Sequence, residues 1–186
     1  MSEWKQVTIV GKGESWQECQ FNTPEIWGTA TCLVHAGMRD KPFTKVFAFD
    51  SRNSLLIEAL EIARERNIPV VSTLEYATEP YPTREVVKDF KVAYFKNTAS
   101  YMLAMAIYQK FDRMWVYGLE QNAALNYVLI RPWVTFWFGV AYGRNIDIRF
   151  GKGVLNWQYK SLGLKQFMTD EKYAEMEEYL GYKIQG

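Results

Sequence analysis

Residues that build metal sites and nucleophilic triads are scarce in this sequence. Among 186 residues there are one histidine and two cysteines, Cys19 and Cys32, whose spacing matches neither a Cys-x-x-Cys pair nor a zinc site. His35 follows a predicted strand and is expected to be structural, since no Ser-His-Asp or Cys-His arrangement can be argued around it. We therefore expect no metal, no cofactor and two reduced thiols, as is typical of a cytoplasmic protein.

Long apolar runs and an excess of charge are also missing. No apolar stretch approaches the roughly 20 residues that cross a bilayer, and residues 1–5 do not begin a secretory signal. The 22 basic and 21 acidic residues are interspersed and give a net charge of +1, which offers no basic face for duplex nucleic acid. The sequence therefore predicts a cytoplasmic protein that binds neither a membrane nor duplex nucleic acid.

Aromatic residues, by contrast, are abundant, at 16% of the chain with seven tryptophans. Such side chains fill cores and oligomer interfaces more often than they stack on bases. Residues 132–142 are predicted to form a helix with Pro132 at its first position and with two opposite apolar stripes. Two apolar faces indicate burial on both sides or a place in a subunit interface, and we expect a homo-oligomer, most simply a dimer. The stripes are Trp133, Phe136, Trp137 and Val140, and opposite them Val134, Phe138 and Ala141.

Short apolar segments alternate with helical ones along the chain. This alternation is typical of a largely parallel sheet covered on both faces, so the sequence predicts a single Rossmann-like α/β domain over residues 1–155. Residues 156–186 are expected to form an extension whose amphipathic helix packs on the same domain. Strands are predicted at 7–10, 25–34 with a break near Gly28, 46–49, 69–72, 114–117 and 146–150, and helices at 53–66, 97–108, 132–142 and from 169.

A glycine loop follows the first predicted strand. Gly11, Gly13 and Ser15 come directly after it, and glycine amides with a serine hydroxyl are able to hold phosphate oxygens. Trp16 stands where a dinucleotide fingerprint has its third glycine, and the Gly-Lys-Ser/Thr ending of a Walker A loop is missing, so NAD and P-loop chemistry are disfavoured. The alternative interpretation is a plain glycine turn.

Two further groups of polar residues lie where strands end or helices begin. Asn97, Thr98 and Ser100 open the buried helix, either as caps or as ligands of a phosphate, ribose or carboxylate. Glu120 follows the fifth strand and is a candidate ribose ligand or catalytic base, or else a solvated loop acid. Arg131 precedes a predicted helix start, where a cation is poorly placed, and is a candidate partner of a ligand phosphate or of Glu120.

Six segments stand out together by their order and spacing, at 9–15, 25–28, 81–87, 94–107, 117–120 and 131–143. With them the chain resembles, over residues 7–155, a family of small Rossmann-like proteins of tailed bacteriophages and prophages. It is more distantly similar to bacterial sialyltransferases that use CMP-activated sugars. The resemblance implies a nucleotide over residues 11–15 with 97–100 opposite, in the cytoplasm of the host cell. The family has Trp-Gly-Leu-Asn at 27–30, Asp at Glu120 and an acid at Thr135, and these departures favour shared binding over shared catalysis.

These observations favour a protein that binds a nucleotide or nucleotide-activated sugar. If it is an enzyme, the simplest reaction is glycosyl-type group transfer, with Glu120 as ribose ligand or base and Arg131 offsetting leaving-group charge. One alternative is a non-catalytic module that sequesters a nucleotide signal used in host defence. Another is a virion or assembly component, for which the surplus aromatic residues would form an interface.

Overall fold

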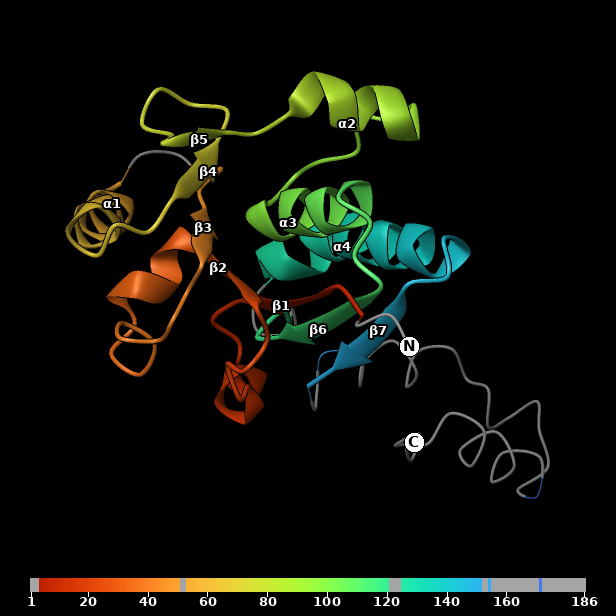
Figure 1. Cartoon of the computed structure of the whole chain (residues 1–186), viewed down its shortest axis with the longest axis horizontal. Coiled ribbons are helices and arrows are strands. Elements are labelled where there is room, and N and C mark those ends of the chain that lie inside the picture. The colour runs from red at the N-terminus through yellow and green to blue at the C-terminus, as the bar shows by residue number, and fades with distance from the viewer. Residues whose placement is uncertain (1–3, 51–52, 121–124, 152–153, 155–170, 172–186) are drawn as a thin grey trace.

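The described residues of the computed structural model, 4–50, 53–120, 125–151, 154 and 171, form one α/β domain. Its seven-stranded sheet is entirely parallel, in the order β5-β4-β3-β2-β1-β6-β7, so the strand order reverses between β1 and β6 (Figure 1). The predicted Rossmann-like fold class is thereby confirmed. The strands are β1 (Gln6–Val10), β2 (Glu25–Thr29), β3 (Lys45–Phe47), β4 (Val70–Ser72), β5 (Glu79–Pro80), β6 (Arg113–Tyr117) and β7 (Asp147–Phe150).

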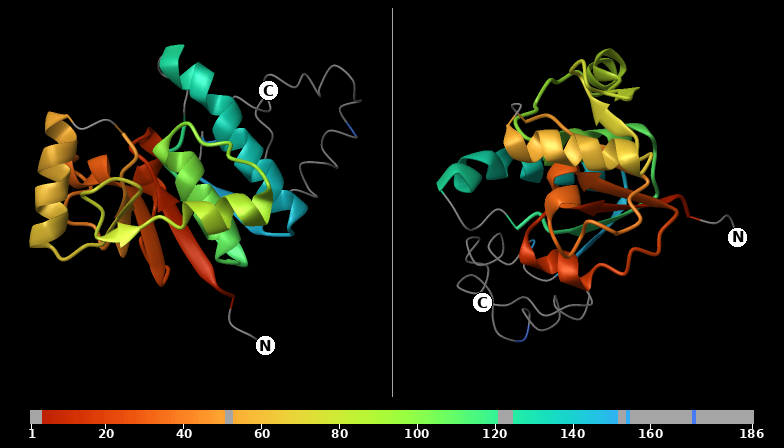
Figure 2. Two further views of the ribbon diagram at one scale, coloured as in Figure 1. Left: turned by 90° about the horizontal axis from the view of Figure 1, so that it is seen from above. Right: turned by 90° about the vertical axis from the view of Figure 1, so that its left-hand side faces the viewer.

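Helices cover both faces of the sheet, and each face has its own hydrophobic cluster (Figure 2). One cluster joins β1, β2, β6 and β7 to α3 and α4, and the other joins β2, β3 and β4 to α1 and η2. In the part of the chain that the structure describes, no helix is long and apolar enough to cross a membrane. The helices are α1 (Ser54–Glu65), α2 (Thr83–Phe90), α3 (Thr98–Tyr108) and α4 (Leu125–Gly143), with 3-10 turns η1 (Glu14–Glu18) and η2 (Ala30–Val34).

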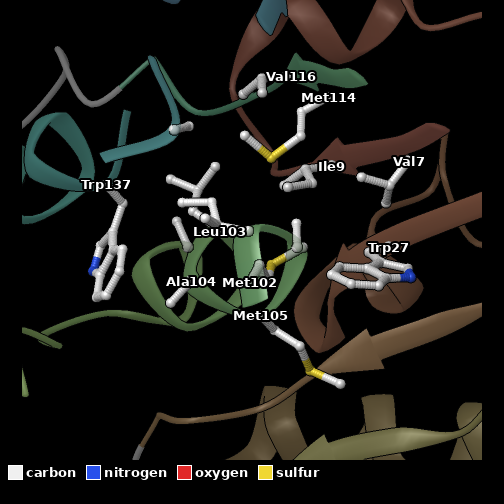
Figure 3. Close-up of a cluster of buried hydrophobic side chains, with 14 of the residues drawn as sticks. Val7, Ile9, Trp27, Met102, Leu103, Ala104, Met105, Met114, Val116 and Trp137 are labelled. Atoms are coloured by element: carbon white, nitrogen blue, oxygen red, sulfur yellow. The ribbon is translucent and has the colours of Figure 1, made fainter. Parts of the chain in front are cut away.

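The helix α3 is buried almost all round, as its uniformly apolar sequence predicts. Figure 3 shows Met102 and Leu103 of α3 close to Ile9 of β1, with Trp137 of α4 on the other side of the helix. Asn97 caps α3 by accepting a hydrogen bond from the Ser100 amide over 3.0 Å. This buried helix carries its N-terminus to the edge of the sheet where the strands end.

The second half of the predicted second strand is wrong, because residues 31–34 belong to the 3-10 turn η2. Thr31 to Val34 has a strand-like composition, but β2 ends at Thr29, where it pairs with Phe47 at the end of β3. Beyond that point the neighbouring strands offer no further pairing partners. The chain therefore turns off the sheet, and Cys32 and Leu33 pack beneath α1 instead.

The predicted start of the helix at residues 132–142 is also wrong. Pro132 lies inside α4, which begins at Leu125 rather than at the proline. Proline removes one backbone hydrogen bond from a helix, and packing of the residues that follow it outweighs that loss. Val134, Trp137 and Phe138 are all at most 5% exposed. The prediction that Pro132 is the first residue of the helix therefore placed the helix start too late.

Both apolar stripes of α4 have partners within the chain. Trp133 stacks on Tyr94 at 3.9 Å between ring centroids, and Trp137 donates from Nε1 to the Tyr94 carbonyl over 2.9 Å. The opposite stripe, with Val134 and Phe138, belongs to the cluster on the sheet. The apolar surplus that motivated the dimer is thus used internally, and the oligomer stays a prediction.

The strand β5 and the helix α2 were missed, and one predicted helix lies outside the described residues. Residues 76–82, for which the sequence predicts neither strand nor helix, contain the short edge strand β5, and α2 follows it. α2 buries only Val86 among its residues, so its sequence carries a weak apolar signal. The terminal helix expected from residue 169 lies outside the described residues.

Candidate functional site

A cleft of about 760 Å³ lies at the carboxyl-terminal edge of the sheet, where the strand order reverses. In open parallel sheets this is where ligands bind, because the strand-to-helix loops separate there. One wall consists of the loops after β1 and β6, and the other consists of the N-termini of α1 and α3 with the segment after β3. We call it the switch-point cleft, and it is lined by residues 11–14, 29, 31, 50, 53, 55–56, 97–99 and 118–120.

Five of the eight site residues predicted from the sequence line this cleft, although they come from three separate segments. Arg131 belongs to α4 by its backbone, and its side chain lies outside the described residues. Ser15 and Ser100 are buried and are not among the lining residues. The five that line it are Gly11, Gly13, Asn97, Thr98 and Glu120.

The two buried serines stabilise the walls of the cleft through internal hydrogen bonds. The Ser15 hydroxyl accepts from the Gly118 amide over 2.8 Å, which ties the β1 loop to the β6 loop. The Ser100 hydroxyl donates to the Asn97 carbonyl over 2.7 Å, and it accepts from the Asn97 amide over 3.4 Å, which completes the capping box of α3. Both hydroxyl groups are therefore already used in supporting the fold.

Backbone amides of the glycine loop donate hydrogen bonds to the end of β6 and to the loop after it. Three of its N–H groups bond to carbonyl or carboxylate oxygens of the neighbouring loop, so they are not free for a ligand. A loop that cradles phosphate needs such N–H groups unpaired. The bonds run from Gly11 N to Tyr117 O over 2.9 Å, from Gly13 N to Gly118 O over 2.9 Å, and from Ser15 N to Glu120 Oε1 over 2.7 Å.

The glycines of both loops are required by this close approach. A β-carbon on Gly11 would overlap the carbonyl oxygen of Gly118, and one on Gly13 would overlap the carboxylate of Glu120. Gly118 also has a φ of 69°, which side chains rarely adopt. Packing of loop against loop is thus a sufficient reason for the glycine pattern.

Glu120 is the most unusual side chain of the cleft. It is 9% exposed, and among the described residues its Oε2 is the buried side-chain oxygen that lacks a hydrogen-bond partner. Leaving such an acceptor unpaired costs about 1–3 kcal/mol. A ligand O–H or N–H group that reached Oε2 would recover that cost.

Asp50 is a lining residue that sequence reasoning missed. It is exposed, follows β3 at the same edge, and accepts a hydrogen bond from the Thr98 hydroxyl over 3.3 Å. The signal that could have found it is its position directly after a predicted strand. In a parallel sheet, that position faces the same edge as Gly11 and Glu120.

Two helix N-termini face the cleft and make part of it attractive to an anion. Asn53 caps α1 and Asn97 caps α3, and both line the cleft. The first N–H groups of a helix have no acceptor within the helix, and they carry a partial positive charge. Lys12 adds a full positive charge, while Leu55, which is 50% exposed, provides an apolar wall.

Neither cysteine is suited to be a nucleophile at this cleft. Burial raises the pKa of Cys19 and of Cys32 to about 11. The reactive form of cysteine is the thiolate, which is scarce near neutral pH at such a pKa. In the described ranges, no group of three or more acidic, histidine or cysteine side chains is placed to hold a metal ion.

A second cavity of about 770 Å³ lies on the sheet face away from α3. It is lined by residues 4–6 and 8 at the start of β1, by the segment 19–25 that leads into β2, by residues 109 and 111, and by β6. Several of its polar groups already bond to one another: Thr8 to Thr23 over 2.7 Å, and Trp115 Nε1 to Gln6 over 3.1 Å. The switch-point cleft is therefore the stronger candidate site.

Comparison of the chain with models of known protein families, with curated proteins and with solved structures finds no match. What the structure itself shows is a parallel α/β fold.

Proposed function

We propose that this protein binds a nucleotide or a nucleotide-activated sugar in the switch-point cleft. The observation that carries the proposal is the convergence of two helix N-termini, Lys12 and three carboxylates on one cleft where the strand order reverses. The carboxylates are those of Glu14, Asp50 and Glu120. Nucleotides combine an anion, hydroxyl groups and an apolar base. The cleft offers a partner for each of these three parts.

Each part of the ligand has a matching wall. The phosphate is placed best beside Lys12 and the N-terminus of α1, because these carry positive charge and the N-terminus of α3 already faces Asp50. Sugar hydroxyls match the carboxylates of Asp50 and Glu120, which accept hydrogen bonds. The base packs on Leu55, whose exposed side chain is otherwise unfavourable in water.

The phage-type resemblance leaves two versions of this function. In the first, the protein transfers a glycosyl group and Glu120 acts as the base. In the second, it sequesters a nucleotide without turnover. The departures from the family pattern at 27–30, Glu120 and Thr135 favour the second, since they favour shared binding over shared catalysis.

A thermal-shift screen tests the binding proposal. A ligand that binds only the folded protein stabilises it by RT ln(1 + [L]/Kd), so millimolar mono-, di- or cyclic nucleotides or nucleotide sugars should raise the melting temperature. Lys12→Gln should reduce the shift, and Lys88→Gln on the exposed side of α2 serves as the control of equal charge. A flat screen across all these classes contradicts the proposal.

Turnover is tested separately with the ligands that bind. Release of free nucleotide from a nucleotide sugar, followed by chromatography, identifies group transfer or hydrolysis. Recovery of the intact ligand after long incubation with stoichiometric protein identifies sequestration.

A further inference from the structure

Two of the positions at which the sequence predicts a phosphate already hold a carboxylate of the chain itself. At the glycine loop, the Ser15 amide donates to Glu120 Oε1 over 2.7 Å. At the N-terminus of α3, the Thr98 hydroxyl donates to Asp50 Oδ2 over 3.3 Å. Backbone N–H groups and helix N-termini stabilise a carboxylate for the same reason that they stabilise a phosphate. A ligand phosphate would compete with a carboxylate at either position.

The same carboxylates are suited to a ligand that donates hydrogen bonds. Phosphate oxygens are acceptors, whereas a sugar hydroxyl is both donor and acceptor. Asp50 is exposed to an incoming ligand, and Glu120 contributes Oε2, a buried oxygen without a partner in the described part of the chain. The two residues follow β3 and β6, so they approach the cleft from opposite walls.

Hydroxyl groups of the protein complete this pattern. Thr29, Thr31 and Thr98 line the same cleft as these carboxylates. The hydroxyls of Thr29 and Thr31 lie within 3.3 Å of each other and that of Thr98 donates to Asp50, so each retains acceptor capacity for a ligand. A threonine hydroxyl can accept from one ligand hydroxyl or donate to another. Hydroxyl-rich walls with carboxylate acceptors match a ring that carries neighbouring O–H groups better than they match a chain of phosphates.

We propose that the cleft recognises its ligand by the hydroxyl groups of a ribose or another sugar ring, with Asp50 as the specificity-determining residue. This inference rests on the proposed function and states which part of the nucleotide is selected. Asp50 accepts from a sugar hydroxyl at the cleft surface. Glu120 Oε2 lies beneath Gly13, lacks a partner in the described residues and is the second carboxylate acceptor at the cleft. The phosphate stays nearer Lys12, outside both carboxylate positions.

The test compares ribonucleoside monophosphates with their 2′-deoxy and 2′,3′-dideoxy counterparts by calorimetry on the full chain. We expect loss of a hydroxyl that bonds a carboxylate to weaken binding roughly tenfold. Asp50→Asn should weaken binding of the ribonucleotides and leave the dideoxy forms unchanged. Glu61→Gln removes one negative charge from an exposed position on α1 outside the cleft and should change neither.

Each other outcome overturns a defined part of the idea. If the wild type binds ribo- and dideoxynucleotides equally, selection by hydroxyl groups is wrong, although nucleotide binding stands. If Asp50→Asn strengthens binding of both forms and of inorganic phosphate, then Asp50 merely fills a phosphate position. If no nucleotide binds the wild type at all, the proposed function itself fails.

The melting temperature without ligand checks that Asp50→Asn keeps the fold. We expect it to be unchanged, because Asp50 is exposed.

A second variant separates geometry from charge. Asp50→Glu keeps the charge but moves the carboxylate outward by one methylene. Its carboxylate should still repel a ligand phosphate, but the variant should lose the discrimination between ribo- and deoxynucleotides. An effect of side-chain geometry is thereby separated from an effect of charge.

Discussion

At the residue scale, the cleft is shaped by the contact between Gly13 and Glu120. Gly13 has an ordinary extended backbone, with φ of −65° and ψ of 159°, so its conformation does not require glycine. The requirement is steric, because a β-carbon would occupy the space of the Glu120 carboxylate. A glycine chosen for space rather than for backbone freedom is recognised only when its neighbour in three dimensions is known.

Gly13→Ala should destabilise the fold by roughly 1–3 kcal/mol, since the added methyl group must displace a buried carboxylate. Urea denaturation measures the change. Gly139→Ala is the matched control, because nothing lies within 4 Å of a β-carbon there and the site is in the interior of α4. That control should stabilise the fold by about 0.5–1 kcal/mol.

The double variant Gly13→Ala/Glu120→Ala separates steric overlap from other causes. If the overlap is the cause, the double variant is more stable than the sum of the two single changes predicts. Additive losses would contradict the steric explanation.

Cys32 should make the fold sensitive to alkaline pH. Its folded-state pKa is raised from 9.0 to about 11 by burial, so the unfolded chain loses this proton first. The associated stability is fully present below about pH 9 and is lost as the pH rises towards 11, and it amounts to roughly 2–3 kcal/mol. Urea denaturation at pH 8 and pH 10.5 should show a smaller loss for Cys32→Ala than for the wild type. Equal losses would show that other groups dominate alkaline unfolding.

At the element scale, the N-terminus of α3 serves the fold before it serves a ligand. Asn97 accepts from the Ser100 amide, and the Ser100 hydroxyl bonds back to the backbone of residue 97. The sequence left open whether these residues are caps or ligands. The structure shows the capping bonds, and Asn97 and Thr98 additionally line the cleft.

Asn97→Ala should cost about 1 kcal/mol, because it removes the side-chain acceptor of the cap. Asn97→Asp keeps an acceptor and should retain the stability of the wild type. The same Asp variant adds negative charge to the cleft and should weaken binding of a nucleotide phosphate. Thermal melts with and without nucleotide measure both effects. A stable Asp variant with unchanged affinity would place the phosphate away from α3.

At the scale of the whole molecule, all seven strands of the described sheet end by Phe150, and Val154 is the last described member of the clusters. Val154 is 1% exposed and belongs to the larger cluster. We therefore expect a chain that ends at residue 155 to fold cooperatively, as judged by circular dichroism during urea denaturation. If residues 156–186 pack on the domain as the sequence predicts, the shortened chain will be less stable than the full one. A shortened chain that does not fold would show that the extension supplies part of the core.

Solution mass is the other measurement at this scale. The predicted dimer would use α4, whose Trp137 and Phe138 are already buried within the chain. Of the large exposed hydrophobic residues in the described part, only Tyr142 lies on α4. Light scattering distinguishes the 21.8 kDa monomer from the dimer at micromolar concentration.

Local sequence patterns by themselves determined the alternation of strands and helices, the buried character of α3 and its start at residues 97–100. These features depend on residues a few positions apart, such as an apolar run that ends in glycine or a group of polar residues before an apolar helix. The same patterns placed the glycine loop and Glu120 directly after strands, and therefore at one edge. Parallel strands bring their carboxyl ends together whatever their order.

Only the tertiary structure decided what those residues do at that edge. The sequence cannot show that the amides of the glycine loop bond to the β6 loop, because about a hundred residues separate Ser15 from Glu120. It likewise could not bring Asp50 to Thr98, stop β2 at Thr29 or begin α4 before Pro132. Each of these depends on pairing and packing with distant segments, which override local propensity because they bury far more surface than any local pattern does.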